Sequence, residues 1–128
     1  MSREQERELD VQISFFEGVV ARDPAYVEAL QALGDGYTRR GKYAAGLKVD
    51  ECLSQLRPED PLVLYNLACS HSLTGDFEQA ARSLERALEC GYSDFKWLAE
   101  DPDLEPFRRH PLYKKIRAKV RLLKSPKA

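Results

Sequence analysis

The side chains best suited to catalysis are few in this sequence. The only histidines are His71 and His110. We interpret His71 as a packing or surface residue of a helix, and His110, which precedes Pro111, as the end of a turn. No glycine-rich phosphate loop, HExxH or GxSxG motif is present. Because catalysis needs a convergent set of groups, we expect the protein not to be an enzyme.

The sulfur and carboxylate side chains lead to the same expectation. Cys52, Cys69 and Cys90 have no metal-type spacing, and we interpret them as helix-packing residues. A sparse, odd set of cysteines fits a reducing compartment, so we expect the protein in the cytoplasm. Acidic pairs such as Glu59–Asp60 and Asp101/Asp103 flank prolines, where helix capping explains them. We predict no metal and no cofactor.

Charge is distributed unevenly along a foldable chain. The sequence is 43% hydrophobic and 32% charged, which is typical of a folded domain. It contains no apolar run of about 18 residues, and its N-terminus is charged, so we expect neither a transmembrane helix nor a secretory peptide. Residues 1–103 carry a net charge of −9 and residues 104–128 one of +8. The chain therefore has an acidic body and a basic C-terminal end, which differ in the charge of the partners they can attract.

The elements that position these residues are set by an internal repeat of 34 residues. Residues 27–60 and 61–94 align without a gap. Each copy has the same order of features: an apolar helical pattern, a glycine, an aromatic residue two positions later, and a second helical pattern. The glycines are Gly41 and Gly75, which fit left-handed helix C-caps. Each unit is therefore predicted to be a helical hairpin.

Capping residues mark where the predicted helices begin. Asp23–Pro24 and Asp60–Pro61 fit an N-cap followed by proline in the first turn. Asp76, with Gln79 three residues later, fits the start of the second helix of the second hairpin. Ser93 is a further predicted N-cap, for a short helix containing Phe95, Trp97 and Leu98.

The repeat also gives a structural interpretation of the four glycines in residues 33–46. Gly41 is the turn, and Gly34 and Gly46 align with Ala68 and Ala80, so they occupy positions where a small residue lets two helices approach closely. Gly36 aligns with Ser70, and we expect a modest cost in helix stability there.

The two repeats resemble those of the tetratricopeptide repeat (TPR) family. The first carries Leu30, Leu33, Gly34, Tyr37, Gly41, Tyr43 and Pro58, and the second Leu64, Leu67, Ala68, Gly75, Phe77, Ala80, Leu84 and Ala87. The sequence departs from the pattern at four positions: His71, Asp50, Leu53 and Tyr92. The resemblance implies an all-α, right-handed superhelical stack of antiparallel helical hairpins, of about seven helices.

The flanks are predicted to cap this stack within one domain, 1–128. In residues 1–26, Leu9, Ile13, Phe16 and Val20 lie on one helical face, which predicts an N-terminal capping helix. Residues 95–124 are predicted to form a C-terminal capping segment, similar to those that close many TPR arrays, with a last helix from Pro111. Its apolar face would hold Leu112, Ile116, Val120 and Leu123, and residues 125–128 would be a tail.

The resemblance implies a groove lined by the first helix of each hairpin, which binds a peptide or partner protein. Helical spacing gives Glu28, Gln31, Asp35 and Thr38 in the first hairpin, and Leu62, Tyr65, Asn66, Cys69 and Ser72 in the second. An asparagine such as Asn66 can bond a peptide amide twice, although "LYNLA" is also common repeat consensus. Because Glu28 and Asp35 are acidic, we expect a neutral or basic partner.

One TPR subclass binds acidic C-termini of heat-shock chaperones through a clamp of Lys, Asn and Arg. Asn66 matches one member of that clamp, but Gln31 and Asp35 stand where Lys and Asn are wanted. Asp35 would repel a carboxylate, so we reject this mode.

Two alternatives to the groove remain open. Lys114, Lys115, Arg117, Lys119 and Arg121 could make the last helix a surface for anionic membranes or nucleic acid, although we favour a capping helix with a solvated basic outer face. We expect neither nucleic acid nor membrane to be the main partner, because base-reading motifs are absent and Leu112, Ile116 and Val120 need burial. The other alternative is self-association, in which the edge hairpins of two chains stack into a homodimer.

Overall fold

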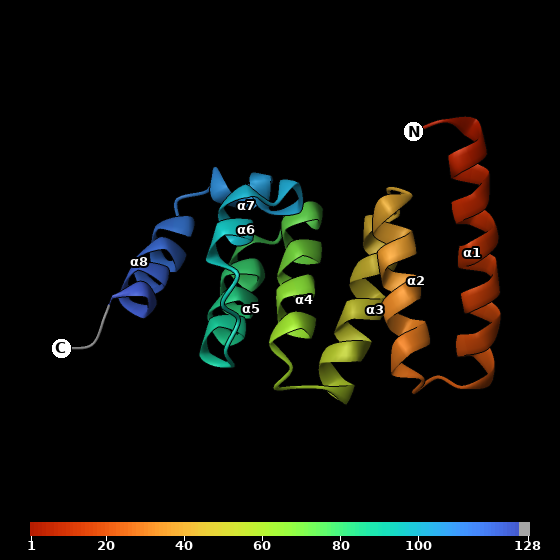
Figure 1. Cartoon of the computed structure of the whole chain (residues 1–128), viewed down its shortest axis with the longest axis horizontal. Helices are drawn as coiled ribbons and strands as arrows, with labels where there is room; N and C mark the ends of the chain where they lie inside the picture. Colours follow the sequence, from red (N-terminus) through yellow and green to blue (C-terminus); the bar gives the residue numbers. More distant parts are fainter. Residues whose placement is uncertain (126–128) are drawn as a thin grey trace. The chain divides into compact units, whose positions relative to one another are not determined.

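The computed structural model describes residues 1–125, and every regular element within them is helical (Figure 1). The predicted all-α class is confirmed. This part of the chain holds eight α-helices and one 3-10 turn, instead of about seven helices, because the segment around Pro102 and Pro106 is broken into short pieces. The predicted tail lies outside the described residues, apart from Ser125.

The chain divides into two compact units, Met1–Pro58 and Glu59–Ala128. The division falls close to the predicted boundary between the repeats, residues 60 and 61. Our expectations that the whole chain is one domain and that the hairpins stack as a superhelix stay predictions.

The first unit contains the first predicted hairpin. It consists of α1 (Arg3–Arg22), α2 (Val27–Arg39) and α3 (Tyr43–Leu56), with α2 and α3 packed against each other. Gly41 ends α2 with a φ of 82°, as its role in the turn requires. A Cβ atom on Gly46 would lie 3.0 Å from Oγ1 of Thr38 and 3.7 Å from the carbonyl oxygen of Gly34. The predicted need for small residues where the two helices approach is therefore confirmed.

Helix α1 packs against α2 and buries Leu9 and Ile13, while Phe16 and Val20 are half-buried. This contact corrects our expectation that Gly36 only weakens its helix. A Cβ atom at Gly36 would lie 3.0 Å from Cγ1 of Ile13, so the missing side chain makes room for α1.

Polar side chains also join α1 to α2. Nε of Arg40 donates to Oδ1 of Asp10 at 2.9 Å, and the hydroxyl of Tyr37 donates to Glu17 at 2.5 Å. Burial, reinforced by the bond to Glu17, raises the pKa of Tyr37 to about 12. The phenol therefore stays protonated at neutral pH and remains a donor.

The predicted helix starts are correct at two positions and wrong at two others. Asp60 caps α4 through the backbone N–H groups of Leu62 and Val63, and Asp76 caps α5 through that of Gln79, as expected. Asp23 does not cap α2: it ends α1, because the residue before a proline is driven to extended backbone, and α2 begins at Val27.

Ser93 was also the wrong N-cap. Asp94 caps α6 instead, since its Oδ1 accepts from the backbone N–H of Trp97 at 3.1 Å. A carboxylate at this position satisfies one of the free N–H groups of the first turn.

The second unit contains the second hairpin and the predicted capping segment. Helices α4 (Pro61–Thr74) and α5 (Phe77–Glu89) pack together, and Gly75 ends α4 with a φ of 82°. The segment that follows forms α6 (Phe95–Glu100), η1 (Pro102–Leu104), α7 (Glu105–Arg108) and α8 (Tyr113–Lys124). Both η1 and α7 lie against α4, while α8 lies against α5.

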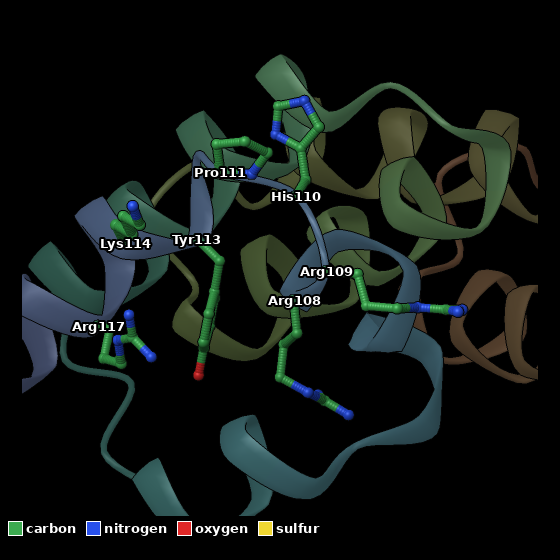
Figure 2. A pocket seen from close by; sticks show the side chains of 7 residues that line it. All are labelled: Arg108, Arg109, His110, Pro111, Tyr113, Lys114 and Arg117. Carbon is green, nitrogen blue, oxygen red and sulfur yellow. The ribbon is translucent and has the colours of Figure 1, made fainter.

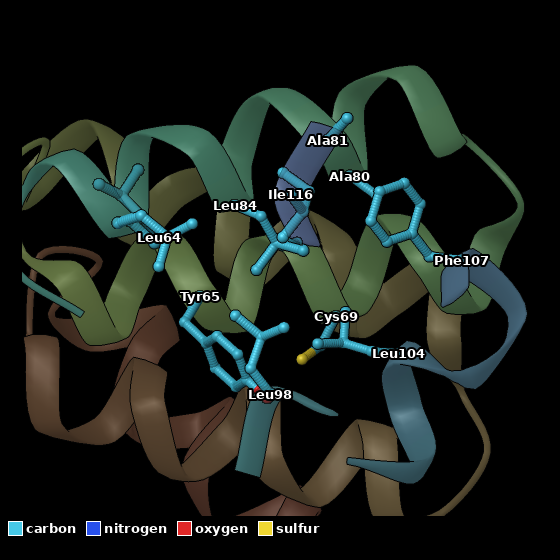
Figure 3. Close-up of a cluster of buried hydrophobic side chains, with 13 residues drawn as sticks. Leu64, Tyr65, Cys69, Ala80, Ala81, Leu84, Leu98, Leu104, Phe107 and Ile116 are labelled. Atoms are coloured by element: carbon cyan, nitrogen blue, oxygen red, sulfur yellow. The ribbon is translucent and has the colours of Figure 1, made fainter. Parts of the chain in front are cut away.

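The core of this unit joins the hairpin to the capping segment (Figure 3). Leu84 of α5, Leu104, Phe107 and Ile116 are all fully buried. Burial of one such aliphatic or aromatic side chain stabilises a fold by about 1.5–3 kcal/mol. The capping segment is therefore an integral part of the second unit.

Helix α8 differs slightly from expectation. It begins at Tyr113, two residues after Pro111. Of its predicted apolar face, Ile116 is buried and Leu112 and Val120 are half-buried, but Leu123 is 49% exposed. The prediction for Leu123 was wrong because α5, the neighbour of α8, ends at Glu89 and does not cover the last turn of α8.

Candidate functional site

One face of α4 is covered by the capping segment of its own unit. Tyr65, Cys69 and Ser72 occupy positions i, i+4 and i+7, which lie on one side of a helix. The Tyr65 hydroxyl donates to Oδ2 of Asp101 at 2.6 Å, and the Cys69 thiol donates to the same oxygen at 3.7 Å. Oγ of Ser72 accepts from the backbone N–H of Phe107 at 3.2 Å. These three residues therefore hold η1 and α7 against α4.

Asp101 is the centre of this arrangement. It lies between α6 and η1, is only 5% exposed, and caps η1 by accepting from the backbone N–H of Asp103 at 2.9 Å. The ring of Tyr92 stacks on Tyr65 with the centroids 4.2 Å apart. One carboxylate thus links the start of η1 to α4.

The surroundings of Asp101 keep its two side-chain donors, Tyr65 and Cys69, protonated. Burial raises the pKa of Tyr65 and of the Cys69 thiol, and the charge of Asp101 reinforces both shifts. Burial also raises the pKa of Tyr92 to about 12. A protonated, buried thiol is a poor nucleophile and a poor metal ligand, so Cys69 acts here as a hydrogen-bond donor and packing residue.

These observations correct the placement of Tyr65 and Cys69 on an open groove face. Tyr65 is only 3% exposed and Cys69 only 7%, so neither is available to a peptide in this structure. Ser72 is buried as well. The physical reason is that residues 95–108 occupy the side of α4 on which the groove was expected.

The rest of the predicted face of α4 is open. Leu62 is 56% exposed, and Asn66, one turn later, is also exposed. Asp60 fixes the start of the helix, and Tyr65 anchors its middle. Leu62 and Asn66 therefore form an apolar and a polar contact point on a rigid helix, which we call the α4 surface.

The candidates in the first unit lie on α2. Gln31 and Asp35 are exposed, and Thr38 is half-buried. Asp35 pairs with Arg39 at 3.8 Å, but both side chains are mostly exposed, so the pair contributes at most about 1 kcal/mol. Glu28 is exposed in the first turn of the same helix.

The basic candidates lie on α8. Lys114, Lys115, Arg117 and Arg121 are exposed. Lys119 is half-buried and donates to Glu89 of α5 at 3.1 Å, and this bond lowers the pKa of the Glu89 carboxyl. Lys119 is thus part of the contact between α8 and α5, unlike the other four.

The two histidines occupy different environments. His71 is buried in α4. His110 lies between α7 and α8, where its Nδ1 accepts from the backbone N–H of Leu112 at 3.1 Å and its ring lies 4.9 Å from that of Phe77. Within residues 1–125 no group of His, Cys, Asp and Glu side chains is arranged to hold a metal ion, and no helix is long and apolar enough to span a membrane.

Sequence reasoning missed the role of Asp101 and the exposure of Trp97. We explained Asp101 by capping, which is correct for its Oδ1, but its Oδ2 binds α4. Trp97 of α6 is 46% exposed although Leu98 beside it is buried. The sequence held one indication of this second role: Asp101 stands between a short helix and Pro102. While Oδ1 of Asp101 caps the turn that begins at Pro102, Oδ2 is left to accept a hydrogen bond from the preceding repeat.

Comparison with known proteins relates the second unit to a repeat family. Residues 63–95 match the family model described as tetratricopeptide repeat. The chain is 38% identical over 76 residues to a chloroplastic protein of Arabidopsis thaliana, and the match covers 57% of this chain and 23% of that protein. It is 31% identical over 103 residues to the peroxisomal targeting signal receptor of Pichia angusta, and this match covers 79% of this chain and 18% of the receptor.

A second receptor of this name, from Candida albicans, is 32% identical over 103 residues, with 79% of this chain and 17% of the receptor covered. The chain therefore spans less than a quarter of the length of these curated relatives.

Proposed function

We propose that this chain, a member of the tetratricopeptide repeat family, binds an extended segment of a partner protein along the α4 surface. Proteins built from this repeat act in protein–protein interaction, and here Leu62 and Asn66 are the exposed residues of the predicted binding face of α4. The relatives named as receptors of a peroxisomal targeting signal support a recognition role, although the chain covers only a small part of each.

The observation that carries the proposal is an exposed amide on an immobilised helix. The side chain of Asn66 is exposed, so its carbonyl oxygen and NH₂ group are accessible to a ligand. Its neighbour Tyr65 is fixed by Asp101, which reduces the conformational entropy lost when a partner binds. Leu62 adds apolar area one turn away.

The charge of the chain suggests the chemistry of the partner. Residues 1–103 carry a net charge of −9, which attracts basic segments and repels acidic ones, so that the partner segment is neutral or basic. We further propose that Gln31, Asp35 and Thr38 of α2 contribute contacts in the first unit, that the protein has no catalytic activity, and that it acts in the cytoplasm.

A selected-peptide experiment tests the α4 surface. Peptides are selected from a random library on the wild-type chain, and their dissociation constants are measured by fluorescence anisotropy. We expect Leu62→Ala combined with Asn66→Ala to raise Kd about tenfold or more, the effect of losing one or two central contacts. Both side chains are exposed, so the thermal melt should stay unchanged.

The matched control is Gln79→Ala, which removes an amide from α5 of the same unit and should leave Kd unchanged. Equal binding by wild-type protein and the double variant would show that the selected peptides bind elsewhere.

A further inference from the structure

A pocket of about 260 Å³ lies where α7 is joined to α8. Its lining consists of Arg108, Arg109, His110, Pro111, Tyr113, Lys114 and Arg117. Figure 2 shows these side chains. In this view the Tyr113 ring lies between the side chains of Arg117 and Arg108. Four of the seven residues are cationic at neutral pH and a fifth is a histidine. Leu62 and Asn66 do not line this pocket, so it is a different site from the α4 surface.

The positive charge of the pocket is not neutralised within the described chain. In residues 1–125, no acidic side chain lies within ion-pair distance of Arg109, Lys114 or Arg117. The acidic neighbour on α5, Glu89, is engaged by Lys119 at 3.1 Å and by Arg86 at 3.5 Å. The pocket therefore keeps a positive potential that attracts anions.

Several of the lining groups are held in place by the fold. Nη1 of Arg108 donates to the carbonyl oxygen of Leu98 at 3.1 Å, which leaves its other N–H groups available. The guanidinium of Arg117 lies 5.8 Å from the centroid of the Tyr113 ring, within the range of a cation–π contact. Fixed donors lose less conformational entropy when they bind a ligand.

His110 is oriented in the same way. Its Nδ1 accepts from the backbone N–H of Leu112, so in the neutral ring the proton is on Nε2. The ring also packs against Phe77. No lining side chain supplies a carboxylate that would repel an anion.

We propose that this pocket binds the phosphoryl group of a phosphorylated side chain in a partner protein. In Figure 2, Arg108, Lys114 and Arg117 lie around the Tyr113 ring, whereas Arg109 points away from it. Several cationic groups suit the three terminal oxygens and double charge of a phosphate monoester better than the single charge of a carboxylate. Tyr113 and Pro111 supply apolar surface for the carbon part of the phosphorylated side chain.

The test uses the full chain with phenyl phosphate, inorganic phosphate and benzoate as probes, at constant ionic strength. Binding is followed through the backbone amide NMR signals of residues 108–117. We expect saturable shifts there with both phosphates, with phenyl phosphate tighter than inorganic phosphate and benzoate at least about tenfold weaker than phenyl phosphate. Equal affinity for benzoate and phenyl phosphate, or the absence of saturable shifts, would overturn the proposal.

Neighbouring residues of α8 provide a matched pair of variants. Lys114 and Arg117 line the pocket, whereas Lys115 and Arg121 are exposed on the same helix and do not. Lys114→Ala with Arg117→Ala should raise the Kd for phenyl phosphate about tenfold or more, because two charge-assisted contacts are lost. Lys115→Ala with Arg121→Ala removes the same charge and should change Kd less than about threefold.

Equal losses in the two double variants would show that the anion responds to a diffuse positive field and not to a pocket. The last part of the experiment distinguishes a lipid headgroup from a phosphorylated protein side chain as the source of the phosphate. Wild-type protein and both double variants are sedimented with phosphatidylserine vesicles, and the bound fraction is measured. Vesicle binding that both double variants weaken equally, without saturable phenyl phosphate binding, would assign the basic end to a membrane surface and overturn the proposal.

Discussion

At the scale of single residues, the bond between Tyr65 and Asp101 decides how the capping segment is held. Tyr65→Phe leaves the ring stacked on Tyr92 but removes the donor to a carboxylate that is 5% exposed. Oδ2 of Asp101 would then keep only the weak thiol donor of Cys69, and a poorly satisfied buried acceptor costs about 1–3 kcal/mol. We therefore expect this loss in the free energy of unfolding, measured by urea denaturation.

Tyr43→Phe is the matched control, because this tyrosine is 40% exposed and its loss should change stability by less than about 0.5 kcal/mol. Equal stability of the Tyr65→Phe variant and wild-type protein would show that Asp101 is satisfied without Tyr65. The larger change Tyr65→Ala should cost about 3–5 kcal/mol, as for other buried aromatic residues. Binding studies of α4 therefore need variants of Asn66 and Leu62 that leave Tyr65 in place.

The misplacement of Tyr65 has a physical cause that the sequence does not reveal. Buried residues surround nearly the whole of α4, among them Val63, Leu64 and Tyr65 at consecutive positions. When a helix is apolar on every side, its periodicity does not distinguish a face that binds ligand from one that packs against the next element. That choice depends on residues 95–108, whose fold is set by prolines and short caps.

At the scale of helices, Gly36 of α2 and Gly18 of α1 give a direct test of close packing. Alanine in place of glycine stabilises a helix by about 0.5–1 kcal/mol when its Cβ atom meets nothing. No atom lies within 4 Å of a Cβ at Gly18, so Gly18→Ala should be stabilising. At Gly36 the same methyl group would contact Ile13 at 3.0 Å and press α1 away from α2.

We expect the Gly36→Ala protein to be about 1–3 kcal/mol less stable than the Gly18→Ala protein, which is the usual cost of overpacking a core. Chemical denaturation of the two variants beside wild-type protein measures this difference directly. If both substitutions stabilise the chain to the same extent, α1 is not held against α2 at this position.

The elements themselves were the most predictable part of the protein. Apolar periodicity, Gly41 and Gly75 placed the two hairpins, because left-handed glycines and helical spacing are local properties. Asp23 and Ser93 were wrongly predicted as N-caps. Pro24 drives Asp23 to extended backbone at the end of α1, and Asp94 caps α6 in place of Ser93. The pocket between α7 and α8 could not be predicted, since it depends on the angle at which the chain turns from one helix to the other.

At the scale of the whole molecule, a net charge of −1 conceals the separation of an acidic body from a basic end. Residues 111–128 contain seven lysines and arginines and no acidic residue. Lys119 joins this end to Glu89 of α5 in a partly exposed ion pair, and ion pairs near the surface contribute about 0–1 kcal/mol. The fully buried Ile116 contributes more, so apolar packing and not charge should hold α8 in place.

The whole chain should therefore be sensitive to the loss of its basic end. Removal of residues 111–128 uncovers the apolar surface of α5 and should lower the melting temperature or cause aggregation. Ile116→Ala keeps every charge but should cost about 2–5 kcal/mol, and Leu122→Ala, at a position that is 76% exposed, should have little effect. Raising the salt concentration should leave the difference between Ile116→Ala and wild-type protein unchanged, because packing is not screened. A truncated chain that melts like the wild-type protein, or an Ile116→Ala defect that disappears at high salt, would contradict a packing role for α8.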